Sequence, residues 1–154
     1  TLLKSGIEPN PVADQEEHWF TYSLYPHGGD WKAASTVKAA YSLNVPLRAR
    51  VVRSSAGSLP KTLSMIRIDA DNVMLETVKK AESSDEIVVR LYEFENKRAD
   101  VKAEFFRELT AVSECDLLEN EINRVSQQGS AFSFEIRPYE IKTFKLKVIP
   151  SHRC

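Results

Sequence analysis

Eight short apolar segments, separated by turn-forming residues, occupy most of the chain from residue 47 onward. Each has the length of a β-strand rather than that of an average helix, and β-branched and aromatic residues are frequent in them. Many short strands of this kind favour two packed antiparallel sheets. The segments are residues 47–52, 63–68, 73–78, 87–92, 99–106, 109–115, 131–136 and 141–149. The sequence therefore predicts a mainly β fold, an antiparallel β-sandwich.

The clearest pair of strands lies between residues 73 and 93. Apolar residues precede an acidic turn at residues 82–86 and alternate with other side chains after it, as in a β-hairpin. These apolar residues are Val73, Leu75, Val78, Ile87, Val89 and Leu91. Residues 111–125 are less clear, because their leucine and glutamate content also suits a helix, although Asn120 and Asn123 weaken that alternative. A strand followed by a loop is the prediction there.

The N-terminal part predicts one further strand and one short helix. Residues 19–24 alternate with aromatic side chains on both faces, which indicates a strand, and Pro26, Gly28 and Gly29 end it. Asp30 then suits the N-cap of a helix at residues 31–43.

We expect a single domain at residues 18–149. The 154-residue chain is 42% hydrophobic, which is enough to bury a core, and no internal repeat is visible. Residues 1–17 read as the remnant of a preceding strand and a linker broken by Pro9 and Pro11, and residues 150–154 as a tail. The chain opens within an apolar run and without Met, so we expect it to be a fragment of a larger polypeptide.

Charge and cysteine content exclude several classes of partner. The 21 basic and 22 acidic side chains leave a net charge of -1, which gives no electrostatic basis for binding nucleic acid. No run approaches the roughly 18 apolar residues that a bilayer-spanning helix needs, so we expect no membrane. Cys115 and Cys154 are too few for a disulfide framework, which favours a reducing compartment.

Metal and catalytic patterns are missing from the sequence. The histidines His18, His27 and His152 lie far apart, and neither cysteine has a partner at ligand spacing. Carboxylates such as Asp69 and Asp71 occur as i, i+2 pairs at strand edges, which solvated strand faces explain better than a glycosidase pair. We therefore predict no catalytic residue and no metal ligand in this chain.

Five sequence strings occur in an order that resembles one enzyme family. They are HWFTYSLYPHGGDW at 18–31, AYSLN with PL at 40–47, VMLETVKKAE followed by RLYE within 73–93, CDLLE at 115–119, and FEIRPYEIKTF at 134–144. In this order they resemble the C-terminal β-domain of glycoside hydrolase family 38 α-mannosidases, of the cytosolic or bacterial type. The resemblance implies a cytoplasmic enzyme.

This resemblance implies a retaining α-mannosidase that removes terminal α-D-mannose and uses one zinc ion, an aspartate nucleophile and a second carboxylic acid. In the family these groups lie in N-terminal and central domains, and none can be assigned to a residue of this chain. The expected function is a non-catalytic C-terminal structural domain that packs against the catalytic domain of the same polypeptide. The chain alone is expected to be inactive and without a cofactor, whereas the full-length enzyme would bind zinc and mannose-containing glycans.

Two residue clusters are candidates for contact with that catalytic domain or with the rim of its active site. The first is Tyr25, His27, Asp30 and Trp31, in a Pro- and Gly-rich loop; the alternative is a helix N-cap with Trp31 in the local core. The second is Arg90, Tyr92 and Glu93, for which a structural ion pair of Arg90 with a cross-strand carboxylate is the favoured interpretation.

An autonomous carbohydrate-binding module is the alternative function. β-Sandwiches often bind sugars, and Trp19, Tyr22, Tyr25 and Trp31 are available as stacking platforms. Such a module would bind mannosides by itself, whereas an interface domain would not.

Overall fold

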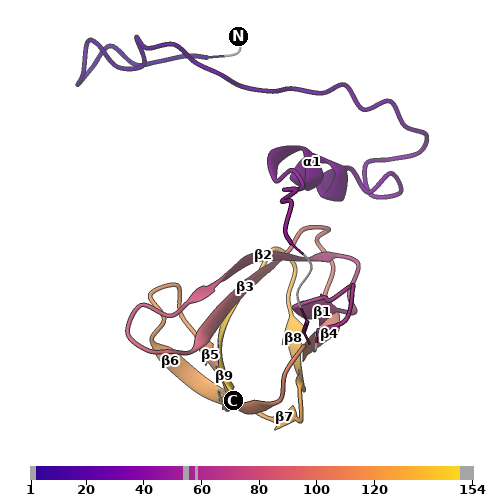
Figure 1. Cartoon of the computed structure of the whole chain (residues 1–154). Helices are drawn as coiled ribbons and strands as arrows, with labels where there is room; N and C mark the ends of the chain where they lie inside the picture. The colour runs from indigo at the N-terminus through magenta and orange to yellow at the C-terminus, as the bar shows by residue number, and fades with distance from the viewer. Residues whose placement is uncertain (1–2, 54–55, 58, 150–154) are drawn as a thin grey trace. The chain divides into compact units, whose positions relative to one another are not determined.

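The structure is a computed structural model that describes residues 3–53, 56–57 and 59–149. It divides into two compact units, Thr1–Arg48 and Ala49–Cys154. All strands of the described residues belong to the second unit, and the helix belongs to the first (Figure 1). The predicted domain limits at residues 18 and 149 stay predictions, and the tail at 150–154 lies outside the described residues.

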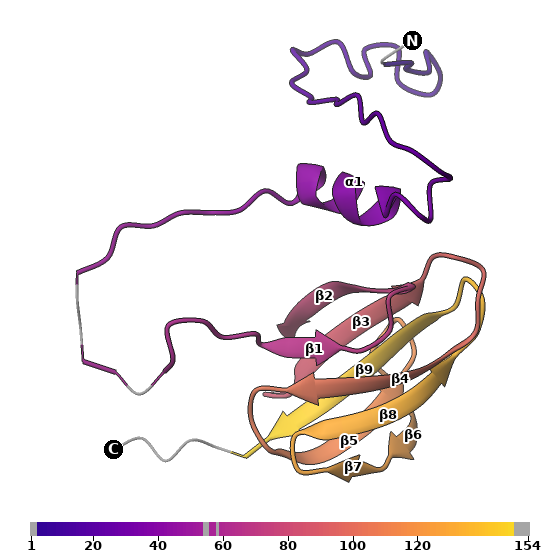
Figure 2. The ribbon, with the colours of Figure 1, turned by 90° about the vertical axis from the view of Figure 1, so that its right-hand side faces the viewer.

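The second unit is an antiparallel β-sandwich, which confirms the predicted fold class. Its two sheets face each other, with β4 and β8 in one layer and β3 and β9 in the other (Figure 2). The four-stranded sheet has the order β1 (Ile66–Ile68), β4 (Ala99–Phe105), β8 (Ala131–Ile136) and β7 (Gln127–Gln128). The five-stranded sheet has the order β2 (Val73–Lys80), β3 (Ile87–Glu93), β9 (Ile141–Val148), β5 (Leu109–Cys115) and β6 (Glu121–Val125).

The core lies between the sheets and follows the period of two that strands impose. Along β4, Val101, Ala103 and Phe105 are buried, whereas the residues between them are exposed. Phe144 of β9 is fully buried against the rings of Phe132 and Phe134 from the opposite sheet, at centroid distances of 5.1 and 4.7 Å. These edge and tilted contacts are favourable aromatic geometries in a core.

Seven of the eight predicted strand segments from residue 47 onward contain a strand of the sandwich. The hairpin at residues 73–93 is confirmed as β2 and β3, with a register shift between Leu75 and Thr77 and a closing hydrogen bond from Ala81 N to Glu86 O of 2.9 Å. The helical alternative for residues 111–125 is wrong, because β5 and β6 pair there as antiparallel strands. The predicted loop after β5 is wrong in its second half, which forms β6.

Two predicted strands do not form within the described part of the chain. Residues 19–24 and 47–52 are extended but belong to neither sheet, and no backbone hydrogen bond joins residues 19–24 to another residue in the described part of the chain. An alternating pattern predicts a strand only if another strand is available to pair with it. Neither segment has such a partner among residues 3–53, 56–57 and 59–149.

The helix is shorter than predicted. Helix α1 spans Thr36–Asn44, whereas the expectation was residues 31–43. Ser35, immediately before the helix, has a φ of 52°, a left-handed conformation that interrupts the preceding turn. Asp30 caps that preceding turn rather than α1, since its Oδ1 accepts a hydrogen bond from Ala33 N at 2.8 Å.

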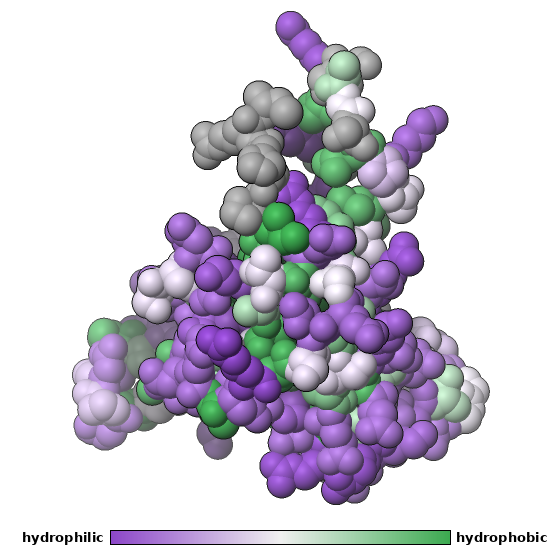
Figure 3. All heavy atoms as spheres, turned by 90° about the horizontal axis from the view of Figure 1, so that it is seen from below, coloured by the Kyte–Doolittle hydropathy of each residue, from purple (hydrophilic) through white to green (hydrophobic). Residues whose placement is uncertain are grey.

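The surface is polar over most of the face shown in Figure 3, with hydrophobic side chains exposed in a smaller area between the polar ones. Among the residues that the structure describes, no helix has the length and apolar character needed to cross a bilayer. Scattered exposed apolar side chains are normal on proteins, so only their concentration on one element carries meaning.

Candidate functional site

Glu93, at the end of β3, is a carboxylate buried to 2% exposure and surrounded by hydrogen-bond donors. Its Oε1 accepts from Asn72 Nδ2 at 2.9 Å and from Glu95 N at 2.7 Å. Its Oε2 accepts from Asn96 N at 3.0 Å and from Tyr139 N at 2.9 Å. One side chain therefore fastens the turn before β2, the β3–β4 connection and the β8–β9 turn.

The environment of Glu93 favours its ionised form. Burial by itself would raise the pKa of this carboxyl, but the hydrogen bonds from backbone amides and from the Asn72 side chain outweigh it and hold the pKa below its usual range. A carboxylate that accepts several N–H bonds has no proton to donate and no free oxygen for a ligand. Glu93 is thus placed to hold loops together and not to transfer protons.

Arg90 and Tyr92 lie on the outer face of the same strand. Arg90 Nε donates to Thr143 Oγ1 on β9 at 3.1 Å, and its Nη2 donates to the Leu117 carbonyl at 3.2 Å. Among the described residues, Arg90 therefore donates to a hydroxyl and a carbonyl rather than to the expected cross-strand carboxylate. Tyr92 packs edge-on against Phe94, with the ring centroids 6.3 Å apart. Arg90 thus ties β3 to β9 and to the β5–β6 loop.

The β5–β6 loop is held by two acidic side chains. Asp116 Oδ1 accepts hydrogen bonds from Leu118 N at 2.8 Å and from Asn120 N at 2.9 Å, and the Asn120 side chain further lowers the pKa of Asp116. Glu119, buried and with a φ of 68°, contacts Lys79 Nζ at 2.7 Å and accepts from the amide of residue 82 at 2.8 Å. The hydrogen bond with Lys79 lowers the pKa of Glu119 and raises that of Lys79.

Three of the five sequence strings that resembled a family contact one another in the structure, namely those within 73–93, at 115–119 and at 134–144. Lys79 of the VMLETVKKAE string contacts Glu119 of the CDLLE string, and Arg90 of the RLYE string contacts Leu117. Glu93 of RLYE holds Tyr139 of the FEIRPYE string. Sequence reasoning missed the roles of Asn72, Asp116 and Glu119, although the CDLLE string itself contained the signal for the last two. All these residues support turns of the sandwich.

We expect Asp116→Ala to loosen the β5–β6 loop without unfolding the sandwich. The substitution removes the acceptor for the amides of Leu118 and Asn120, which are otherwise exposed. Hydrogen exchange at these two amides should accelerate roughly 10-fold, as the loss of one hydrogen bond predicts. Asn123→Ala on the exposed strand β6 is the control and should leave both rates unchanged. Equal rates in the Asp116 variant would show that the loop is held by its other contacts.

The first predicted cluster lies in the other unit. Tyr25 and His27 are adjacent, with ring centroids 5.5 Å apart, and the Tyr25 hydroxyl donates to the Ala34 carbonyl at 3.1 Å. Trp31 is 41% exposed, with Lys32 Nζ 5.3 Å from its ring centroid. Asp30 caps the adjacent turn. These contacts are local, and contact with a catalytic domain stays a prediction.

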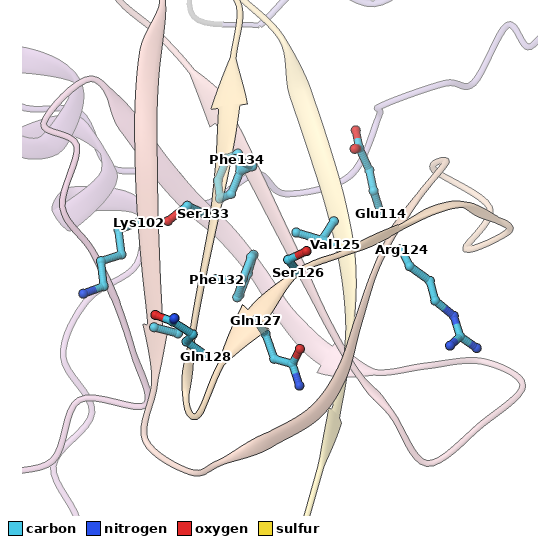
Figure 4. A pocket seen from close by; sticks show the side chains of 11 residues that line it. Lys102, Glu114, Arg124, Val125, Ser126, Gln127, Gln128, Phe132, Ser133 and Phe134 are labelled. Carbon is cyan, nitrogen blue, oxygen red and sulfur yellow. The ribbon is translucent and has the colours of Figure 1, made fainter.

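An open cleft of about 580 Å³ lies between β6, β7 and β8. Figure 4 shows Phe132, Phe134 and Val125 along it, while the charged ends of Lys102 and Arg124 point away on opposite sides. Glu114, which also lines the cleft, is paired with Lys142. Ligand sites usually combine apolar walls with polar groups that converge, and the charged groups here do not converge.

The described residues do not fit a zinc site. No group of three His, Cys, Asp or Glu side chains that could hold a metal ion occurs among residues 3–53, 56–57 and 59–149. His152 and Cys154 lie outside the described residues. Cys115 is buried, and burial raises the pKa of its thiol, which disfavours the thiolate that metals require.

Comparison with known proteins identifies the sandwich. A family model described as the glycosyl hydrolases family 38 C-terminal beta sandwich domain matches residues 72–144. Alpha-mannosidase 2C1 of Homo sapiens is 32% identical over an alignment of 155 positions, which covers 97% of this chain and 15% of that protein. Alpha-mannosidase G of Dictyostelium discoideum is 32% identical over 153 residues, covering 94% of this chain and 14% of its own length. The chain thus spans about 15% of the length of the human relative.

The matched region begins at Asn72 and ends at Phe144. It contains Glu93 with its four hydrogen-bond donors, and both acidic residues of the β5–β6 loop. Residues 72–144 are thus the C-terminal β-sandwich domain of glycosyl hydrolase family 38, and relatives that align with nearly the whole chain are named α-mannosidase.

Proposed function

We propose that this chain is the non-catalytic C-terminal structural part of a zinc-dependent, retaining α-mannosidase that removes terminal α-D-mannose in the cytoplasm. In this role it packs against the catalytic domain of the same polypeptide and supports it. Zinc and the catalytic carboxylates are supplied by other parts of that polypeptide, and its substrates are mannose-containing glycans.

This proposal rests on the hydrogen bonds and ion pairs that Glu93, Asp116 and Glu119 make within the chain. A catalytic carboxylate needs an oxygen that can reach substrate, either to attack or to exchange a proton. Both oxygens of Glu93 instead accept internal hydrogen bonds. Asp116 and Glu119 are likewise occupied by loop amides and by Lys79. A constellation of this kind supports a rigid scaffold. Relatives named α-mannosidase, of which the chain spans 14 to 15%, support the wider enzyme.

We expect the purified 154-residue chain to hydrolyse no p-nitrophenyl α-mannoside and to retain no zinc by elemental analysis. The full-length polypeptide should hydrolyse this substrate and retain zinc, and zinc removal should abolish its activity. Glu93→Gln in the chain alone serves as the matched control. It should lower the stability of the fold, and like the unsubstituted chain it should show no hydrolysis. Hydrolysis by the isolated chain with stoichiometric zinc would overturn the proposal.

The same preparation tests the carbohydrate-binding alternative. Trp19 and Tyr22 are 87% and 77% exposed, as stacking platforms would be. If the isolated chain binds mannosides, tryptophan fluorescence should change on titration, and Trp19→Ala should remove the change. The scaffold role predicts no change in fluorescence with either protein.

A further inference from the structure

We propose that residues 19–24 are a β-strand that pairs with a sheet in the part of the α-mannosidase polypeptide lying outside residues 1–154. The inference rests on the proposed function, because that function supplies the rest of the polypeptide. It deepens the function by naming the segment through which this chain joins its neighbour. The observation that supports it is an extended, aromatic-rich segment that has no pairing partner in the described part of the chain.

The side chains of residues 19–24 are those of a buried strand. Phe20, Tyr22 and Leu24 occupy one face of an extended backbone, while Trp19 shares the other face with Thr21 and Ser23. The segment ends at Pro26, which cannot donate to a ladder. Its six residues match the common length of strands in globular proteins, about five or six residues.

The structure leaves this segment exposed. Leu24 is 89% and Trp19 87% exposed, and Phe20 is more than half exposed. A single exposed apolar residue needs no explanation, but four large ones within six residues are a concentrated patch. The backbone is also open, because no amide or carbonyl of residues 19–24 bonds to another backbone group within the described ranges. The exposed apolar side chains and the unbonded backbone groups therefore both favour pairing of this segment with another strand.

The sandwich of this chain does not need the segment. Its hydrophobic core is built from residues between Ile66 and Leu146, with no earlier residue among those described. The two sheets have the orders β1-β4-β8-β7 and β2-β3-β9-β5-β6, and neither includes residues 19–24. The second unit therefore forms its core and both of its sheets from its own residues.

The length of the relatives indicates where the sheet that pairs with residues 19–24 lies. Two relatives align with 94 to 97% of this chain. The aligned region covers 14 to 15% of their length, so they are about seven times longer than it is. A covalently connected sheet has a high effective concentration at the segment, which a second copy of the chain lacks. We therefore assign the partner to the same polypeptide.

Hydrogen exchange followed by mass spectrometry tests the assignment in the full-length polypeptide, with the 154-residue chain as reference. Amides 20–24 should exchange at nearly the unprotected rate in the reference. In the full-length polypeptide they should slow by at least about 100-fold, as expected for a strand paired on a stable sheet. Equally fast exchange in both would overturn the inference. Protection in the reference that grows with protein concentration would also overturn it, because a second copy would then be the partner.

A pair of substitutions adds a matched control. Phe20→Asp with Leu24→Asp in the full-length polypeptide should abolish the protection of residues 20–24, because charges cannot be buried on the covered face. Gln15→Asp, outside the segment, should leave the protection unchanged. Loss of protection in both variants, or in neither, contradicts a specific pairing through this face.

These readouts separate the inference from the proposed function. A full-length polypeptide that hydrolyses α-mannosides but leaves residues 20–24 unprotected would refute the strand and keep the function. A polypeptide that protects them but has no mannosidase activity would refute the function, and the pairing itself would stand.

Discussion

Phe144→Ala should lower the free energy of unfolding of the sandwich by about 3 to 5 kcal/mol, the range typical of removing a large buried aromatic side chain. Phe144 is fully buried on β9, which lies between β3 and β5 in its sheet. Its ring contacts Phe132 and Phe134 of the opposite sheet. Alanine would therefore leave a cavity at the point where the two layers meet, and the surrounding strands cannot close it without breaking their register.

Urea unfolding followed by circular dichroism measures this loss. Ile141→Ala lies on the same strand but is 55% exposed, so it should cost less than about 1 kcal/mol and serves as the control. Phe144→Leu should fall between the two, because it keeps most of the buried volume. A Phe144→Ala cost equal to that of Ile141→Ala would show that the two sheets are not packed through these rings.

Glu93→Ala should be similarly damaging, at about 3 to 5 kcal/mol, because it leaves several buried or part-buried donors without their acceptor. The donors are the side chain of Asn72 and the amides of Glu95, Asn96 and Tyr139. They come from three separate connections, so no single local rearrangement can satisfy them all. Glu93→Gln should cost less than the alanine variant but remain destabilising, since its amide group presents a donor to at least one N–H.

The contribution of Glu93 also depends on pH, and the sign follows from its lowered pKa. The folded protein holds this carboxyl ionised below the pH at which the unfolded chain protonates it. Its stabilisation is therefore complete above the unfolded pKa and is lost as the pH falls through the folded pKa. Urea unfolding at pH 7 and at pH 3 should show a smaller drop for Glu93→Gln than for the unsubstituted chain. An identical drop would show that other carboxylates govern the acid sensitivity.

The sequence alone was sufficient for the sandwich and for the hairpin of β2 and β3. Alternation of Val89 and Leu91 with Arg90 and Tyr92 is a local property of the chain, and burial on one face of a sheet is its direct physical consequence. The strings near Glu93 and Asp116 were likewise visible as a family resemblance. What they do was not visible, because the donors to Glu93 lie up to 46 residues away in sequence.

Residues 19–24 mark the boundary between what sequence and what tertiary structure decide. Their alternation predicts a strand with an apolar face, because the pattern depends on the side chains themselves. Whether an extended segment becomes a strand depends on a second backbone that supplies the hydrogen bonds, and in the described part of this chain none does. The end of the helical turn at Ser35 and the hydrogen bonds of Glu93 were similarly decided only in three dimensions, since both depend on geometry that the local pattern does not contain.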